Sequence, residues 1–273
     1  MKSMPAQYSL GLCGFPLGHS LSPALHQAAL QACGLTGSYT LYPIPPLPDG
    51  HSLLAALLER LRSGEIRGLN VTIPHKQAVI PLLDHLTPTA QAIGAANTLY
   101  SEAGQLIGDN TDAPGFLADL AHLPLSGEKE AIVLGAGGAA RAVVYALQQQ
   151  GWQIHIAARQ PAKAAGLAKA LSADMGRITT SQLDGTALRA AAQTCRLIVN
   201  TPPAGMTPHT DGNPWPADLP LPQGACLYDL VYNPVETTLV RAARANGLPA
   251  RSGLGMLIEQ AALAFERWTG QQV

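Results

Sequence analysis

The chain has 273 residues, a length that accommodates two domains of ordinary size with a core in each. Charged residues make up 13% of it, and 17 basic against 18 acidic side chains leave a net charge of −1, which argues against nucleic acid or an anionic membrane as the main partner. Aromatic residues, at 5%, are too few for a surface on which single-stranded bases stack.

Neither a membrane anchor nor a secretory signal is expected from the sequence. No apolar run approaches the length of a membrane span, and the first nine residues, MKSMPAQYS, lack the apolar core of a signal peptide. The cysteines stand singly in apolar segments, without metal-ligand spacing; they are Cys13, Cys33, Cys195 and Cys226. We therefore expect a cytoplasmic protein with buried free thiols and no metal site.

Two hydroxyl groups precede the first expected helix. A strand is predicted over residues 8–13, after which Ser22 is expected to cap a helix that has Pro23 at its first position. Ser20 lies just before this cap. Two hydroxyls beside a helix N-terminus suit a small carboxylate, although Ser22 as a cap alone is an equally good explanation.

A lysine follows the third expected strand. Strands are predicted over residues 38–44 and 66–72, with a helix over residues 52–62 between them. This alternation predicts a parallel α/β sheet, in which ligands gather at the carboxyl ends of the strands, where Thr72 and Lys76 lie. A lysine at such an end is often only solvated, but one that faces a cleft can donate a proton.

Two polar clusters interrupt the next apolar segments. After a short helix that ends near Leu83, strands are expected over residues 95–100 and 106–112, and a helix over residues 113–120. Asn97 with Thr98, and Asn110 to Asp112, are explained either by turn and cap chemistry or by a site in which Asp112 pairs with Lys76.

A glycine-rich turn predicts a dinucleotide site. The strand over residues 131–134 runs into Gly135, Gly137 and Gly138, and a helix follows with its apolar face on Ala140, Val143, Val144 and Leu147. Glycine at 135 permits a backbone that a Cβ would forbid, and glycine at 137 lets a phosphate approach the main chain. The helix N-terminus then faces the anion.

The residues after the next strand indicate which dinucleotide is bound. Gly151 ends the helix, and a strand is expected over residues 153–157. An NAD site would usually place a carboxylate at its end, but the residues there are Ala158, Arg159 and Gln160, with Lys163 one turn later. Arg159 suits a 2′-phosphate, which favours NADP, although a solvated arginine is common at a strand end.

The remaining elements complete this second part of the chain. Strands are expected over residues 197–201 and 225–230, and helices over residues 235–246 and 254–268. Residues 207–223, rich in proline, are predicted to form a surface loop and the most mobile stretch. The last helix is amphipathic and is expected to pack in a core.

The sequence closely resembles the shikimate dehydrogenase family. The resemblance spans residues 14–270 and rests on motifs in the family's order: Ser20-Leu-Ser22, Asn70-Val-Thr-Ile-Pro74 with Lys76, Gly94-Ala-Ala-Asn-Thr98, Asp109-Asn-Thr-Asp112, Gly135-Ala-Gly-Gly138, Tyr228-Asp-Leu-Val-Tyr232 and Gly253-Leu-Gly-Met-Leu-Ile-Glu-Gln260. It implies a two-domain α/β fold with an N-terminal substrate domain over residues 1–106 and a C-terminal Rossmann-type NADP-binding domain over residues 107–253. The helix from about 254 to 273 would pack back on the first domain, and substrate would lie in a cleft that closes.

The implied activity is the reversible, NADPH-dependent reduction of 3-dehydroshikimate to shikimate in aromatic amino acid biosynthesis. By this resemblance Lys76 and Asp112 are catalytic, and Ser20 and Ser22 bind the substrate carboxylate. The other substrate-binding residues implied are Thr72, Asn97, Tyr232 and Gln260. The cofactor-binding residues implied are Gly135, Ala136, Gly137, Gly138, Ala139, Ala158, Arg159, Gln160, Lys163, Thr201, Leu230, Gly253 and Met256.

Two departures from the family pattern leave alternatives open. The family's Asn-Arg-Thr reads Ala158-Arg159-Gln160 here, which predicts a weaker preference for NADP, and the tail after Trp268 is brief. The alternatives are a dual quinate/shikimate dehydrogenase that uses NAD or NADP, an aminoshikimate-type relative, and a non-catalytic NADP-binding sensor. Serine at both 20 and 22 favours shikimate. A monomer and a homodimer are both compatible with the sequence.

Overall fold

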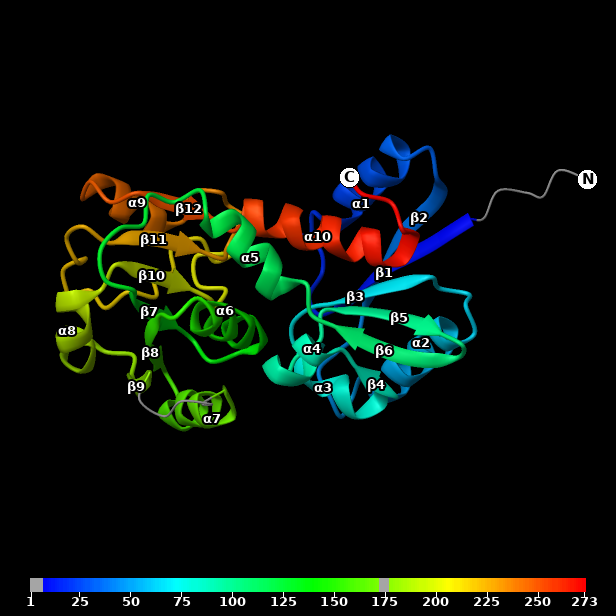
Figure 1. Cartoon of the computed structure of the whole chain (residues 1–273), viewed down its shortest axis with the longest axis horizontal. Coiled ribbons are helices and arrows are strands. Elements are labelled where there is room, and N and C mark those ends of the chain that lie inside the picture. The colour runs from blue at the N-terminus through cyan, green and yellow to red at the C-terminus, as the bar shows by residue number, and fades with distance from the viewer. Residues whose placement is uncertain (1–6, 172–176) are drawn as a thin grey trace, which may run out of the picture. The chain divides into compact units, whose positions relative to one another are not determined.

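The computed structural model describes residues 7–171 and 177–273 and contains two compact units. The first unit comprises residues 7–111 together with Gln260–Val273, and the second comprises Asp112–Glu259. Each unit has one six-stranded sheet with helices around it (Figure 1), so the expected α/β class is confirmed. The domain bounds and the cleft expected from the sequence stay predictions.

The first unit is built on a mixed sheet. Its strands lie in the order β2-β1-β3-β5-β6-β4, and its elements are β1 Gln7–Gly14, α1 Ser22–Ala32, β2 Thr36–Pro43, α2 His51–Arg62, β3 Gly68–Val71, α3 His75–Ala78, the 3-10 turn η1 Ile80–Leu82, β4 His85–Leu86, α4 Pro88–Ile93, β5 Thr98–Glu102 and β6 Gln105–Asp109. Strand β1 pairs in parallel with β2 and β3, whereas β5 is antiparallel to both β3 and β6.

The expectation of a wholly parallel sheet is therefore wrong for this unit. Only Ala103 and Gly104 connect β5 to β6, and both have positive φ angles, 50° and 78°. Two residues cannot carry the chain back across a sheet, so the second strand must run antiparallel to the first.

Two separate apolar clusters cover the faces of this sheet. Leu10 packs with residues of α1 and of the C-terminal part of helix α10 (Leu254–Thr269), including Leu30 and Phe265. Cys13 lies three residues after Leu10 on β1, so its side chain points to the opposite face of the sheet, where it packs with residues of α2 such as Leu54. The alternation of side chains along the strand thus places α1 and α10 against one face and α2 against the other.

The second unit has the strand order of a dinucleotide-binding fold. Its sheet runs β12-β11-β10-β7-β8-β9, as Figure 1 shows, and every pair is parallel. The elements are α5 Asp112–Leu120, β7 Glu130–Leu134, α6 Gly138–Gln149, β8 Gln153–Ala158, α7 Pro161–Leu171, β9 Ile178–Gln182, α8 Gly185–Thr194, β10 Leu197–Asn200, β11 Cys226–Asp229, α9 Thr238–Ala245, β12 Ala250–Ser252 and the start of α10. The expected Rossmann-type domain is confirmed.

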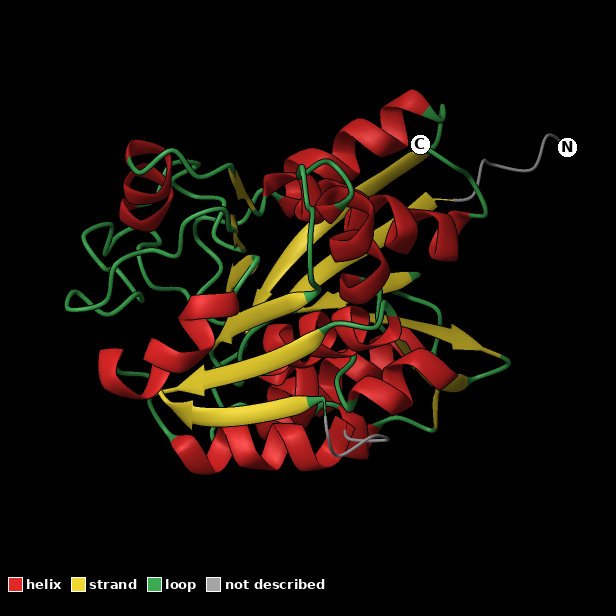
Figure 2. Cartoon of the chain, turned by 60° about the vertical axis from the view of Figure 1, so that its left-hand side comes forward, coloured by secondary structure: helices red, strands yellow, loops and turns green. Residues whose placement is uncertain are grey.

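Helices lie on both faces of this second sheet (Figure 2). Leu227 of β11 belongs to a core cluster with residues of α8 and α9, including Leu188 and Leu239. The next residue, Tyr228, faces the other way and meets Phe116 of α5 edge-on, with the ring centroids 5.1 Å apart. Parallel strands buried on both faces explain why the sequence here is apolar without alternation.

The start of helix α1 differs from the prediction. Ser22 is the first helical residue and Leu21 is the N-cap, with no side-chain cap. The hydroxyl that accepts a bond from this end belongs to Ser20, whose Oγ lies 3.2 Å from the amide nitrogen of Ser22. Ser22 as N-cap is therefore wrong, because Ser20 already accepts from the amide that opens the helix. Helix α9 likewise begins later than expected, with Thr237 as its cap, because the Thr237 hydroxyl accepts from the Val240 amide.

The proline-rich segment is irregular, as predicted, but it is not simply a surface loop. Trp215 is 5% exposed, and with Leu219 and Leu221 it belongs to the core cluster of the second unit. The Trp215 indole donates to the Leu219 carbonyl at 2.7 Å, which fixes the local turn. A surface position is therefore wrong for these three residues, and mobility stays a prediction.

All four cysteines are free thiols, as expected. Cys13, Cys195 and Cys226 are buried, but Cys33 is only half-buried because it ends helix α1 near the surface. Burial raises the pKa of Cys13 and of Cys195 to about 12, which keeps both thiols protonated and unreactive. Within residues 7–171 and 177–273, no helix is long and apolar enough to cross a membrane.

Candidate active site and cofactor site

The glycine-rich turn after β7 requires glycine at its first position. Gly135 has a φ angle of 97°, and a Cβ there would lie 2.6 Å from Thr201 Oγ1 and 2.9 Å from a ring carbon of Pro202. Thr201 follows β10, the strand beside β7, and its hydroxyl donates to the Leu134 carbonyl at 2.6 Å. The turn thus lies where the strand order reverses, the position at which parallel sheets bind ligands.

Gly137 leaves open space in front of helix α6. It is the N-cap of the helix, it is exposed, and a Cβ built there would meet nothing within 4 Å. The backbone is extended, so glycine is not required by the conformation. The first amides of a helix have no intrahelical acceptor and attract an anion. The neighbouring residues Ala136, Gly138 and Ala139 also have small side chains or none. The exposed backbone beside these amides therefore fits a pyrophosphate.

The residues expected to select the 2′-phosphate follow the neighbouring strand. The Gly135 amide donates to the Ala157 carbonyl at 2.8 Å, which fixes the start of the turn against the end of β8. Ala158 ends that strand and is buried, whereas Arg159, Gln160 and Lys163 are exposed. Residues 158–163 thus contain a guanidinium and an ammonium but no carboxylate, which suits a phosphate better than a ribose diol.

The remaining cofactor candidates lie on the same edge of the sheet. Leu230 follows β11 and donates its amide to the Asn200 carbonyl at 2.9 Å. A Cβ on Gly253, which follows β12, would lie 2.2 Å from the Leu230 carbonyl oxygen, so only glycine allows these two strand ends to approach. Met256 is buried in the first turn of α10. Together with Thr201, these residues extend the candidate cofactor edge from β8 to β12.

A buried polar cluster that the sequence reasoning missed supports this edge. The Asp229 carboxylate accepts from Asn200 Nδ2 at 2.7 Å and from Thr237 Oγ1 at 2.6 Å, and it also accepts from the Val231 amide. Burial raises the pKa of Asp229. The feature of the sequence that could have revealed this cluster is an aspartate at the end of an apolar strand, because a carboxylate buried there must be hydrogen-bonded.

In the first unit, the loops after β1 and β3 lie side by side. The Phe15 amide donates to the Ile73 carbonyl at 2.9 Å, and the Thr72 amide donates to the Cys13 carbonyl at 2.8 Å. A Cβ on Gly14 would lie 2.3 Å from Thr72 Cγ2, so the glycine makes room for this threonine. These contacts bring the loop that carries Ser20 and Ser22 next to Thr72.

Lys76 lies in the short helix α3 directly after this loop. It is half-buried, and its carbonyl accepts from the Ala96 amide at 2.8 Å. The neighbouring His75 is fully buried, with Nε2 2.8 Å from the Ile44 carbonyl oxygen. The backbone bond to Ala96 places the lysine segment against the segment that carries Asn97.

Asn97 and Gln260 meet in a buried polar cluster. Asn97 Nδ2 lies 2.9 Å from Thr111 Oγ1 and 3.3 Å from Gln260 Oε1. Asn97 Oδ1 accepts from the Thr111 amide at 2.8 Å and from the Thr98 hydroxyl. Asn97 and Gln260 are 2% and 8% exposed. Two residues that are 163 positions apart in the sequence thus share one buried hydrogen-bonded cluster.

Asp112 and Tyr232 belong to the second unit. Asp112 is the buried first residue of α5, and Tyr232 is half-buried after β11. The pairing of Asp112 with Lys76 stays a prediction.

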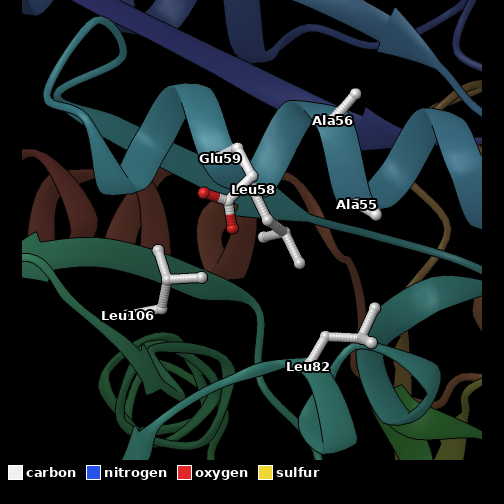
Figure 3. A pocket seen from close by; sticks show the side chains of 6 residues that line it. All are labelled: Ala55, Ala56, Leu58, Glu59, Leu82 and Leu106. Carbon is white, nitrogen blue, oxygen red and sulfur yellow. The ribbon is translucent and has the colours of Figure 1, made fainter.

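A shallow hollow elsewhere in the first unit contains none of these residues. Its volume is about 250 Å³, and its lining, shown in Figure 3, consists of Ala55, Ala56, Leu58, Glu59, Leu82 and Leu106. One carboxylate among aliphatic side chains offers no polar group that would orient a hydroxylated acid. Among the residues that the structure describes, no cluster of three or more His, Cys, Asp or Glu side chains could hold a metal ion.

Comparisons with known proteins found family models and relatives that match this chain. Residues 12–99 match the family model of the shikimate dehydrogenase substrate-binding domain, and residues 253–273 match that of the shikimate 5'-dehydrogenase C-terminal domain. A shikimate dehydrogenase (NADP(+)) of Salinibacter ruber is 42% identical over 265 residues, which cover 94% of this chain and 90% of the relative. That of Moorella thermoacetica is 42% identical, over 96% of this chain and 88% of its own.

Solved structures resemble the chain over almost its whole length. The crystal structure of shikimate 5-dehydrogenase from Thermus thermophilus in complex with NADP(H) and shikimate has a TM-score of 0.84 and 39% identity, covering 97% of this chain and 94% of that one. Quinate dehydrogenase from Corynebacterium glutamicum in complex with NAD has a TM-score of 0.84 and 34% identity, covering 98% and 95%.

Proposed function

Since the chain belongs to the shikimate dehydrogenase family, we propose that it catalyses the reversible NADPH-dependent reduction of 3-dehydroshikimate to shikimate. It is an NADP-dependent oxidoreductase that acts on a CH–OH group, in the shikimate pathway of aromatic amino acid biosynthesis. The observation that carries the proposal is the match, over more than nine-tenths of the chain, to relatives named shikimate dehydrogenase (NADP(+)).

The chemistry needs a proton at the oxygen that hydride transfer makes negative. NADPH, when bound, supplies the hydride to the carbonyl carbon of the substrate. In our proposal the Lys76 ammonium stabilises the nascent alkoxide and protonates it, and Asp112 orients the lysine and accepts from a substrate hydroxyl. In the reverse direction, neutral Lys76 accepts the proton from the shikimate hydroxyl.

Substrate orientation is assigned to side chains of both units. Ser20 and Ser22 donate to the carboxylate, beside the first amides of α1. Thr72, Asn97 and Gln260 bind the ring hydroxyls, and Tyr232 completes the substrate contacts. Support comes from the buried Asn97–Gln260 cluster, because amide side chains held by other hydrogen bonds recognise hydroxyls without having to be ordered first.

NADP binding is assigned to the edge of the second sheet. In our proposal the turn from Gly135 to Ala139 holds the pyrophosphate, and Arg159, with Gln160 and Lys163 beside it, holds the 2′-phosphate. A single bidentate guanidinium without a neighbouring hydroxyl predicts a measurable preference for NADP, weaker than a complete phosphate pocket would give.

A dual quinate/shikimate dehydrogenase is the second candidate. The similarity to a quinate dehydrogenase solved with NAD favours it, and so does the absence of the family's usual Asn and Thr around Arg159. The serine pair at 20 and 22 favours shikimate, because dual-specificity relatives often carry a bulkier threonine at one of these two positions.

A steady-state assay that crosses shikimate and quinate with NADP and NAD tests the proposal. We expect the highest kcat/KM for shikimate with NADP. Comparable values with quinate or NAD would assign the protein to the dual-specificity group. An absence of turnover with every pair, together with NADPH binding, would support a sensor or an amino-substrate relative instead.

We also propose a reducing, cytoplasmic location and small-molecule partners only. Four free thiols in one chain fit a reducing compartment. The near-neutral charge balance fits an enzyme that binds neither nucleic acid nor membrane. Light scattering after gel filtration would distinguish a monomer from a homodimer.

A further inference from the structure

One carboxylate of the first unit holds three segments together. Asp109 ends β6 and is 6% exposed. Its Oδ1 accepts from the Thr87 hydroxyl at 2.7 Å and from the Asn110 amide at 2.8 Å, and its Oδ2 lies 2.9 Å from an Arg267 guanidinium nitrogen. Three donors on one buried carboxylate fix the position of its side chain.

Each of the three donors belongs to a segment that carries part of the Asn97–Gln260 cluster. The Thr87 hydroxyl also accepts from the Ala90 amide, so it caps helix α4, and the chain reaches Asn97 four residues after that helix ends. Asn110 is followed by Thr111, which bonds Asn97 through both its amide and its hydroxyl. Arg267 lies on α10, the helix that carries Gln260. Asp109 is thus the common anchor of the segments that form the cluster.

Arg267 and Gln260 lie on the same face of α10. They are seven residues apart, which is close to two helical turns. The Arg267 guanidinium also lies over the Tyr100 ring, 5.8 Å from its centroid, and the adjacent Trp268 indole donates to the Leu99 carbonyl at 3.1 Å. A Cβ on Gly68 would lie 2.2 Å from the Trp268 ring. These contacts determine how far α10 is rotated and shifted along β5 and β6, and therefore where Gln260 meets Asn97.

We propose that Asp109 and Arg267 are positioning residues for the substrate-binding pair Asn97 and Gln260. The inference rests on the proposed function, since it assigns these two residues to the recognition of a hydroxylated substrate. The Arg267 side chain is half exposed, so solvent screens its charge, and Asp109 keeps two other donors when Arg267 is removed. Its effect is therefore expected in the affinity for the substrate more than in the stability of the fold.

The test compares two arginine variants of the full-length protein. Arg267→Met removes the charge and keeps the length of the side chain. Arg60→Met is the matched control, because Arg60 also pairs with an acid, Glu65, at 2.8 Å, is 42% exposed, and lies over a tyrosine ring, 5.4 Å from the Tyr42 centroid. Arg60 lies on α2, which carries none of the proposed site residues.

We expect Arg267→Met to raise the KM for shikimate about fivefold, an effect of ~1 kcal/mol, with kcat and the KM for NADP within twofold of the wild type. Arg267→Lys, which keeps the charge, should restore most of the affinity. Because the Arg267 side chain is half exposed, the difference in KM between wild type and Arg267→Met should shrink at high salt. Arg60→Met should leave all three kinetic parameters unchanged.

An unchanged KM for shikimate in Arg267→Met would overturn the inference, and so would an equal rise in the KM values for shikimate and NADP, which would indicate a general distortion. A fall in melting temperature alone, equal to that of Arg60→Met, would make Arg267 a stability residue only. Failure of the proposed function is distinct, because the wild type itself would then not turn over shikimate.

Discussion

The two sheets of the molecule bring their candidate ligand-binding residues together in different ways. In the parallel sheet of the second unit, five candidate residues lie at or directly after the carboxyl ends of strands, and so they lie on one edge: Gly135, Ala158, Thr201, Leu230 and Gly253. In the mixed sheet of the first unit, Thr72 follows a strand whereas Asn97 precedes one. Because β5 runs antiparallel, its beginning lies at the carboxyl end of β3, where the Val71 amide donates to the Asn97 carbonyl. An antiparallel strand thus brings the residues that precede it to the edge at which the parallel strands end, where they can take part in a site.

The two edges also differ in the groups they present. The second unit offers backbone at Gly137 and exposed cations such as Arg159, whereas the first unit offers buried amides that are already hydrogen-bonded. Backbone binds a phosphate whatever the surrounding side chains are, but a buried amide recognises a hydroxyl only in one geometry. The difference predicts that changes at the cofactor edge of the second unit mainly alter affinity for the cofactor, and that changes in the first unit alter chemistry and substrate recognition.

The largest effect is expected for the proton donor. Lys76→Ala should lower kcat about 10³-fold, within the range for general acid–base groups, and leave the KM for shikimate within a few-fold of the wild type. Steady-state kinetics in both directions measures the two parameters. Lys163→Ala is the control from the cofactor edge, and it should change the KM for NADP only. A rise in KM for shikimate as large as the fall in kcat would make Lys76 a binding residue instead.

The buried polar groups of the first unit should also make stability depend on pH. His26 lies in α1, stacks on Tyr39 with the ring centroids 4.4 Å apart, and is 1% exposed. Burial lowers the pKa of His26 to about 4, below the 6.5 of an ordinary histidine. Between these values the unfolded chain binds the additional proton, so stability is complete above about pH 6.5 and is lost as the pH falls towards 4, by ~3 kcal/mol in all.

Urea unfolding at pH 7.5 and pH 4.5 measures this loss. His26→Phe keeps a ring against Tyr39 and cannot be protonated, so its unfolding free energy should vary less between the two pH values than that of the wild type. The same pH dependence in both proteins would assign the acid sensitivity to other groups.

A smaller effect is expected from glycine substitutions in the cofactor turn. Gly137→Ala should leave the melting temperature unchanged, because the backbone is extended and the new Cβ meets nothing within 4 Å. It should raise the KM for NADP about thirtyfold, since displacing the pyrophosphate weakens a charge-assisted hydrogen bond of ~2 kcal/mol. Gly135→Ala is the contrast, and it should lower the melting temperature as well, because its Cβ would collide with Thr201. Equal effects of the two substitutions on stability would contradict the open space seen at Gly137.

The smallest effect is expected at the 2′-phosphate. Arg159→Ala should lower the ratio of kcat/KM for NADP to that for NAD about tenfold, the loss of ~1.4 kcal/mol of charge-assisted bonding. The rate with saturating NAD should not change, because Arg159 is exposed at the end of β8 and has no proposed role in the chemistry. An unchanged ratio would assign the selectivity to Lys163, which Lys163→Ala then tests.

The second unit was the more predictable part of the molecule. The glycine turn with its flanking strand and helix, and the lack of an acid after β8, are local signals. In the structure, β7, α6 and β8 lie within a few residues of their predicted bounds. The burial of Trp215 could not be foreseen, because composition predicts a loop but not whether its apolar side chains reach a core. The helix start at Ser22 was misplaced by one residue, since Ser20 and Ser22 are equally good capping residues in sequence.

The sequence by itself determined the local geometry, namely the positive φ angle of Gly135, the periodicity of α6 and the cations that follow β8, because these depend on backbone sterics and on neighbours within a few residues. Only the tertiary structure decided that β5 runs antiparallel, that Asn97 meets Gln260, and that Asp109 joins Thr87 to Arg267. Such contacts join residues far apart in the chain, and they form only when the packing of whole helices and strands brings the polar groups within hydrogen-bond distance and buries them together.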